Sequence, residues 1–151
     1  MKTSRPTRSA ADIDGAVYVT IPAMARYVLE VAAAFEAAHH LRSYRGAPEP
    51  VHGHSWKVVA RLSAERLDGE GIAFDFVAVR DALRRLAARF DHNDINTVPP
   101  FDVVSPTTER LAEWFHQELR RELGPDAPLD AVTVFEGPDA SATFEAEGGG
   151  A

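Results

Sequence analysis

Two histidines separated by one glycine, in the stretch VHGHSW at residues 51–56, have the type and spacing to bind a metal ion. Side chains two positions apart on a β-strand point to the same face, so His52 and His54 can present two imidazoles to one ion. Gly53 between them leaves room for another backbone or a ligand to come close. Two histidines on a strand are also often only exposed or hydrogen-bonded, and a third ligand is needed to decide between these interpretations.

The segment FEAAHHL offers that third ligand as His39 or His40. Three histidines with an open fourth position form a catalytic zinc site, in which the ion polarises a substrate oxygen or activates water. A cupin would also use two such histidines, but with a glutamate a few residues later, whereas Glu65 is eleven residues past His54. The chain has no cysteine, which excludes thiolate ligands, disulfides and a cysteine nucleophile.

The spacing of apolar residues along the chain predicts the strands and helices that would position these histidines. Alternation of apolar residues in HSWKVVARL predicts a strand from His52 to about Leu62. The turn residues DGEG and the segment IAFDF then predict a hairpin with a second strand at 71–76. The run from Tyr27 to His39 is rich in both Ala and Val, so composition leaves it open between helix and strand.

Two amphipathic helices and a second hairpin are predicted in the remainder of the chain. Ser105 is the expected N-cap of the second helix, with Pro106 at its first position, and Gly124 ends it. LDAVTVFE and ASATFE, separated by GPD, predict the closing hairpin. The apolar stripes of the helices are Val79, Leu83, Leu86, Ala87 and Phe90, and Leu111, Trp114, Phe115, Leu119 and Leu123. The sum is an α+β domain with an antiparallel four-stranded sheet and two helices on one face.

Length and composition limit the number of domains, the location and the kinds of partner that can be expected. The 151 residues suit one domain, assigned to residues 25–146, with a partly disordered N-terminal extension (1–24) and a disordered tail (147–151). No stretch approaches the apolar length of a membrane span, and no secretory signal pattern is present, so the cytoplasm is the expected location. A net charge of -7 argues against nucleic acid as a partner.

Six segments in order resemble the superfamily of 6-pyruvoyltetrahydropterin synthase and 6-carboxytetrahydropterin synthase, over about residues 27–145. They are FEAAH (35–39), HGHSW (52–56), GIAFDF (71–76), FDHNDIN (90–96), SPTTERLA (105–112) and VTVFE (132–136). The resemblance implies the tunnelling fold, in which the first apolar run is a strand. It also implies a homohexamer whose sheets close into barrels, with small-molecule sites between subunits.

The resemblance further implies roles for eight residues. The zinc ligands would be His39, His52 and His54, with His40 left as the spare. Asp91 would orient His92 for proton transfer, while Glu136 would anchor the guanidine-like edge of a pterin ring beside Thr107 and Thr108. Each has a plainer alternative without the family: a loop hydrogen bond for the Asp-His pair, a surface carboxylate for Glu136, and ordinary first-turn residues for the threonines.

The catalytic cysteine expected a few residues before HGH is missing, and the corresponding stretch reads RSYRGAPEPV. Glu49 is the only carboxylate in this stretch, and some members of the superfamily carry a glutamate in that role and cleave the pterin side chain in an aldolase-like manner. The prediction is a zinc-dependent lyase of the pterin synthase type. It would act on dihydroneopterin triphosphate or a related pterin-like or nucleoside-derived substrate. The alternatives are a non-catalytic metal-containing binding protein and a biosynthetic enzyme with a non-pterin substrate.

Overall fold

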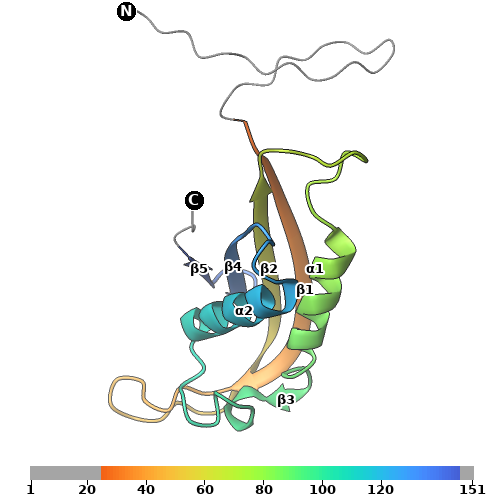
Figure 1. The fold of residues 1–151 in the computed structure, drawn as a ribbon. Helices are drawn as coiled ribbons and strands as arrows, with labels where there is room; N and C mark the ends of the chain where they lie inside the picture. Colours follow the sequence, from red (N-terminus) through yellow and green to blue (C-terminus); the bar gives the residue numbers. More distant parts are fainter. Residues whose placement is uncertain (1–24, 147–151) are drawn as a thin grey trace, which may run out of the picture.

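The computed structural model describes residues 25–146 and has one sheet with two helices packed on one face (Figure 1). The strands lie in the order β3-β1-β2-β4-β5. The predicted disorder of residues 1–24 and 147–151 concerns segments outside the described residues. The elements are β1 (Tyr27–His39), β2 (His52–Ala64), α1 (Phe76–Ala87), β3 (Asn93–Asp94), the 3-10 helix η1 (Ile95–Thr97), α2 (Thr108–Leu123), β4 (Leu129–Glu136) and β5 (Ser141–Glu145).

The sheet has five strands, so the prediction of four was wrong. The additional edge strand is β3, which is only two residues long and runs parallel to β1, pairing Asn93 with Ala37 and Asp94 with Ala38. The other pairs of neighbouring strands are antiparallel, as predicted. A two-residue strand has too little periodicity to be recognised in a sequence.

The hairpin predicted at 71–76 was also wrong, because this segment is a loop that leads into α1. Asp68 closes the turn by accepting hydrogen bonds from the backbone N–H groups of Glu70 and Ile72, both at 2.9 Å. Asp75 then acts as the N-cap of α1, and its carboxylate accepts the N–H of Val77 at 2.8 Å. The capping aspartate therefore starts a helix where the apolar composition alone suggested a strand.

The core lies between the sheet and the helices. β1 and β2 pair without interruption from Tyr27 opposite Ala64 to His39 opposite His52, and alternate residues of both strands face the helices. Phe35 and Trp56 meet in this layer as a stacked pair with centroids 6.0 Å apart. α1 packs mainly over β1, and α2 packs over β4 and β5, so the predicted helix stripes are the buried ones.

The start of α2 differs from the prediction. Its first residues line the cavity described below. Thr107, and not Ser105, is the N-cap, and its hydroxyl accepts the N–H of Arg110 at 3.2 Å. Ser105 instead accepts the backbone N–H of Arg42. Gly124, with φ of 87°, ends the helix as predicted. Neither α1 nor α2 has the length and apolar character required to cross a membrane.

Candidate metal centre

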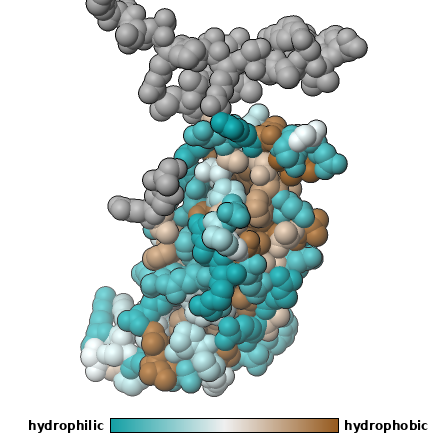
Figure 2. Space-filling model, viewed as in Figure 1, coloured by the Kyte–Doolittle hydropathy of each residue, from teal (hydrophilic) through white to brown (hydrophobic). Residues whose placement is uncertain are grey.

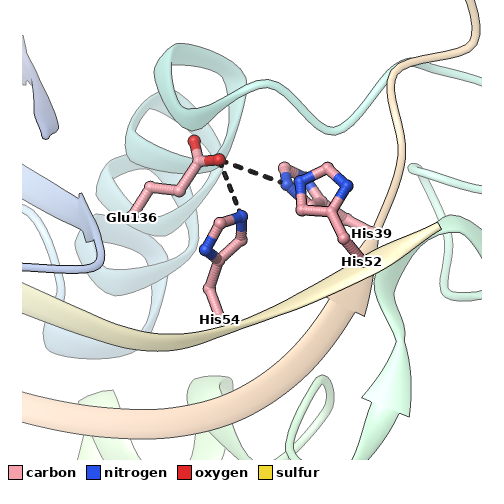
Figure 3. Close-up of side chains that lie close together, drawn as sticks. All are labelled: His39, His52, His54 and Glu136. Carbon is pink, nitrogen blue, oxygen red and sulfur yellow. Dashed lines mark ion pairs between the residues drawn. The ribbon is translucent and has the colours of Figure 1, made fainter. Parts of the chain in front are cut away.

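His39, His52, His54 and Glu136 bring one potential ligand atom each to within 4.8 Å of one another (Figure 3). His39 ends β1, and the register of the ladder sets it opposite His52 at the start of β2. His54 follows on the same face of β2, and Glu136 ends β4. Three neighbouring strands thus deliver the four side chains to one point, on the face of the sheet that carries the helices.

Two of the histidines are held by backbone carbonyls through their outer nitrogens. Nδ1 of His39 lies 2.9 Å from the carbonyl oxygen of Pro106, and Nδ1 of His52 lies 2.9 Å from that of Pro50. A carbonyl oxygen only accepts, so Nδ1 carries a proton in both rings, and in the neutral form of such a ring Nε2 keeps its lone pair. A histidine that binds a metal through one ring nitrogen usually donates the N–H of the other nitrogen to a carbonyl, a carboxylate or water.

The Nε2 atoms of the histidines, which point toward one another, have the environment expected of metal ligands. Nε2 of His39 and Nε2 of His54 are buried and, among residues 25–146, have no partner with hydrogen-bond geometry, but both lie within ion-pair distance of Glu136. Glu136 Oε1 lies 3.4 Å from the first and 2.9 Å from the second. Burial lowers the pKa of His39, which favours the neutral form that can coordinate an ion. Imidazole nitrogens and a carboxylate oxygen gathered at one point form a donor set that could hold a divalent cation.

A cavity of about 390 Å³ is lined by one histidine of the cluster, His39, and by four other predicted site residues, Glu49, Thr107, Thr108 and Glu136. Glu49 lines it and is fixed by Leu41, whose N–H donates to Oε2 of Glu49 at 3.1 Å, while the N–H of Glu49 donates to the carbonyl of Leu41 at 2.9 Å. The loop around Glu49 therefore brings this carboxylate into the same cavity as His39 and Glu136. The spacing of the loop in the sequence did not establish this.

The two predicted threonines also line the cavity but have different functions in the structure. Thr107 caps α2, whereas the hydroxyl of Thr108 donates a hydrogen bond to Oε2 of Glu136. Glu109, which sequence reasoning did not single out, lies in the same cavity. Its position directly after the two threonines, in the first turn of α2, was the signal that could have identified it.

Asp91 and His92 lie elsewhere in the single chain. Nδ1 of His92 is 3.0 Å from the carboxylate of Asp91, as the predicted pair requires, but the His92 side chain is 79% exposed. His92 borders a shallow groove that is also lined by His54 and by Glu36 and Ser55, whose side chains bond to each other. The N–H of Glu36 donates to Asp91, and this hydrogen bond is the main cause of the lowered pKa of that carboxyl group.

Two residues near the histidines have structural explanations. His40 is outside the cluster, and its backbone N–H and carbonyl both bond to the side chain of Asn96. A Cβ at Gly53 would meet only the carbonyl oxygen of Ala37, at 3.8 Å, an ordinary contact. Within one chain the glycine is therefore not required for close approach, contrary to the expectation from its place between the histidines.

Fold and site together define an α+β protein with a cluster of three histidines and a glutamate at its strand ends that could hold a metal ion. Residues 28–147 match the family described as 6-pyruvoyl tetrahydropterin synthase. The chain therefore belongs to the 6-pyruvoyl tetrahydropterin synthase family, as its motifs predicted.

Two relatives illustrate the range of named activities. The chain is 26% identical over 113 residues to dihydroneopterin monophosphate aldolase of Pyrococcus furiosus, a match covering 75% of this chain and 92% of the relative. It is 31% identical over 107 residues to 6-carboxy-5,6,7,8-tetrahydropterin synthase of a Synechocystis species. This match covers 68% of this chain and 80% of the relative. Both relatives are named as enzymes of pterin metabolism.

Solved structures with low sequence identity share this fold. The 6-pyruvoyl tetrahydropterin synthase of Caenorhabditis elegans superposes with a TM-score of 0.71 at 21% identity, covering 82% of this chain and 98% of the other. A variant of Plasmodium vivax 6-pyruvoyltetrahydropterin synthase, in which a glutamate described as a catalytic residue is replaced by alanine, superposes with a TM-score of 0.66 at 19% identity. That match covers 80% of this chain and 97% of the other.

Proposed function

We propose that the protein is a zinc-dependent lyase that acts on the side chain of dihydroneopterin triphosphate or a related pterin-like or nucleoside-derived compound, with aldolase-like chemistry. The observation that carries the proposal is the convergence of His39, His52 and His54 beside a cavity that also contains Glu49. Lyase chemistry needs a proton acceptor in the cavity in addition to the carboxylate that would bind the ring, and Glu49 can supply it. The similarity to an archaeal aldolase supports the same class of reaction.

The three histidines would hold the zinc ion through Nε2 of His39, His52 and His54. When bound, zinc supplies a Lewis acid that polarises an oxygen of the substrate side chain. The carbonyls of Pro106 and Pro50 contribute by fixing two of the rings, as described above. Removing these orienting contacts would weaken metal binding even with all three ligands present.

Glu49 is the proposed base. Aldol cleavage requires a group that removes a proton from a side-chain hydroxyl before the carbon–carbon bond breaks. Glu49 lines the cavity next to His39, and its backbone and one carboxylate oxygen are tied to Leu41. A fixed carboxylate can take this proton repeatedly from the same direction. A glutamate is also the residue described as catalytic in the Plasmodium vivax relative.

Glu136 is the proposed anchor for the ring of the substrate. Its carboxylate is held by the hydroxyl of Thr108 at one oxygen and faces the histidines with the other. A carboxylate accepts two parallel hydrogen bonds from an amidine-like edge, such as that of a pterin. Ring binding here would place the side chain of the substrate near the histidine cluster.

Asp91 and His92 would act in a neighbouring subunit. The pair is exposed, and within one chain neither residue lines the cavity that contains Glu49, although His92 shares a groove with His54. In the homohexamer that the family resemblance predicts, sites form between subunits, and an exposed Asp-His pair is available to a second copy. His92 would return a proton to the carbon left by bond cleavage, with Asp91 orienting its ring.

The direct test is to incubate zinc-loaded protein with dihydroneopterin monophosphate, dihydroneopterin triphosphate and unphosphorylated dihydroneopterin, and to analyse the products by mass spectrometry. A lyase of the proposed type releases a shortened pterin and a small aldehyde from at least one of them. Formation of a pterin that keeps all side-chain carbons indicates synthase chemistry instead. Tight binding of a pterin with no product would show a binding protein and overturn the proposal.

A further inference from the structure

Asn96 is a buried polar residue with no part in the proposed reaction. It ends the segment FDHNDIN, in which Asp91 and His92 are the residues with a proposed role. The face of the molecule that carries the helices is mainly hydrophilic (Figure 2). Among residues 25–146, the polar or charged residues that are buried are His39, Asn96 and His116. Burial of an amide is unfavourable unless it is hydrogen-bonded, so the partners of Asn96 indicate what it does.

The side chain of Asn96 forms two hydrogen bonds with the backbone of His40, the residue that follows the proposed zinc ligand His39. Oδ1 of Asn96 accepts the N–H of His40 at 2.9 Å, and Nδ2 of Asn96 donates to the carbonyl of His40 at 3.0 Å. A backbone N–H only donates and a carbonyl only accepts, so this pairing fixes the orientation of the amide. Asp94 holds Asn96 itself, because its carboxylate accepts the N–H of Asn96 at 2.9 Å at the start of η1.

Asn96 and the segment that follows it also hold Arg42, on the other side of Leu41. The N–H of Arg42 donates to the hydroxyl oxygen of Ser105 at 3.0 Å, and its guanidinium donates to the backbone carbonyl of Asn96 at 3.2 Å. Both neighbours of Leu41 are therefore fixed by contacts with residues 96–105. The end of β1 is held in place at its backbone and not only by the packing of its side chains.

Leu41 in turn holds the proposed base. Its N–H donates to Oε2 of Glu49 at 3.1 Å, and its carbonyl accepts the N–H of Glu49 at 2.9 Å. Residues 43–48, which connect the two, are exposed. The position of Glu49 in the cavity therefore depends on the position of Leu41, and this position depends on the contacts that Asn96 makes on either side of it.

We propose that Asn96 is a positioning residue that fixes the carboxylate of Glu49 relative to the histidine cluster, through the backbone of residues 40–42. Asn96 does not line the cavity, so it acts through Glu49 and not on the substrate. The ring of His39 has a contact of its own with the carbonyl of Pro106, so loss of the Asn96 side chain should displace Glu49 and leave the zinc ligands in place. The effect on catalysis rests on the proposed function of Glu49 as the base.

Amide hydrogen exchange tests the geometry without any need for activity. In Asn96→Ala, the amides of Leu41 and Glu49 should exchange at least about tenfold faster than in the natural protein, because the hydrogen bonds between these residues open more often. The amide of Val58, buried in the middle of β2, is the reference for any change in overall stability, and the acceleration is measured relative to it. Unchanged relative exchange at Leu41 and Glu49 would overturn the proposal.

Two further variants complete this measurement. Thr97→Val is the matched control, because the hydroxyl of the exposed Thr97 donates to the carbonyl of Asp94 and not to residues 40–42, and both rates should stay as in the natural protein. Asn96→Asp keeps the size of the side chain and the acceptor for the N–H of His40, but it loses the donor to the carbonyl of His40. It takes the place of Asn96→Ala if circular dichroism shows that the alanine variant is not folded.

A double-mutant cycle tests the effect on the reaction. Asn96→Ala should lower kcat by about tenfold to 100-fold, since a displacement of about 1 Å can have an effect of this size, with KM and zinc content unchanged. In the Glu49→Gln background the same substitution should lower kcat by less than about twofold, because the group that it positions has already lost its function. Equal losses of kcat in the two backgrounds would show that Asn96 supports the fold in general, and they would overturn the proposal.

The two experiments distinguish failure of this proposal from failure of the proposed function. If the natural protein converts no pterin, the proposed lyase activity is wrong, and the exchange rates still decide whether Asn96 fixes Glu49. If the natural protein is active and the amides of Leu41 and Glu49 do not respond to Asn96→Ala, the positioning proposal alone is wrong.

Discussion

His39 and His52 lie directly opposite each other in the β1–β2 ladder, with ring centroids 4.7 Å apart. Opposed residues on one face of an antiparallel pair are the closest cross-strand neighbours, and His54 continues the same face of β2. The histidine cluster is therefore a product of strand register. A slip of one residue would turn His52 and His54 to the opposite face and dismantle the site.

Replacement of any one of the three cluster histidines by alanine should weaken zinc binding by at least about 100-fold, since loss of mere orienting contacts already costs 10-fold to 100-fold. Zinc content after dialysis, measured by plasma mass spectrometry, checks this. The control is His40→Ala, because this neighbouring ring lies outside the cluster. Gly53→Ala should also retain zinc, since its new Cβ meets only an ordinary contact. Equal zinc loss in His40→Ala and His39→Ala would contradict the assignment.

Glu49→Gln should lower kcat by about 100-fold or more while zinc content stays unchanged, because the amide keeps the shape but cannot accept a proton as a base. The amide oxygen can still accept the hydrogen bond from Leu41, so the loop keeps its anchor. Glu70→Gln, in the exposed turn before α1, is the matched control. Full activity of Glu49→Gln would show that Glu49 is not the base, and it would not affect the assignment of the metal ligands.

Thr108→Val should raise KM with a smaller effect on kcat, because the hydroxyl that holds the carboxylate of Glu136 is lost. A hydrogen bond to a charged group contributes about 1.5–3 kcal/mol, so the increase in KM is expected to be roughly tenfold or more. Thr108→Ser keeps the hydroxyl and should behave like the natural protein. If both variants show the same kinetics, this contact has no part in substrate binding.

Subunit mixing tests the proposed contribution of His92 to a neighbouring site. Glu49→Gln and His92→Ala should each be nearly inactive alone, while a mixture that has been dissociated and reassembled should recover part of the activity. Recovery arises because a hybrid interface combines an intact Glu49 from one chain with an intact His92 from another. Mass spectrometry shows whether hybrid oligomers have formed. If they have formed and the mixture is still as inactive as the separate variants, His92 does not act in the site of a neighbouring subunit.

His116 should make the fold sensitive to acid. It is buried against Phe144, and burial, followed by the charge of Arg120, lowers its pKa. The folded state therefore resists protonation, while the unfolded state takes up a proton below about pH 6.5, so stability falls as pH falls through that value toward the depressed pKa. Relative to His116→Leu, the natural protein should lose up to about 1.4 kcal/mol of unfolding free energy per pH unit in this window. Urea unfolding between pH 5 and 8 measures the difference. A constant difference across that range would contradict the expectation.

The sequence predicted those parts of the fold that depend on periodicity and capping over many residues. β2, both helix stripes, the end of α2 at Gly124 and the final hairpin all follow from local patterns. The segment 71–76 was misassigned because the capping role of Asp75 outweighs its apolar neighbours. β3 depends on a tertiary contact with β1 and has no local signal of its own.

Sequence pattern and family resemblance together pointed to the residues of the histidine cluster, but not to its geometry. The HGH spacing indicated that His52 and His54 share a face, whereas the choice of His39 over His40 rested on family resemblance and is consistent with the register of β1. The placement of Glu49 depends on backbone bonds to Leu41 that no sequence pattern specifies. The separation of His92 from the cavity follows from the way the loop after α1 crosses the edge of β1, which is likewise a tertiary feature.

The most direct test of the metal centre is anomalous diffraction from zinc-loaded crystals at the zinc absorption edge. We expect one strong peak per chain, about 2.0–2.1 Å from Nε2 of His39, His52 and His54. A peak bound by other residues, or no peak at that position under saturating zinc, would contradict the assignment on which the proposed chemistry rests.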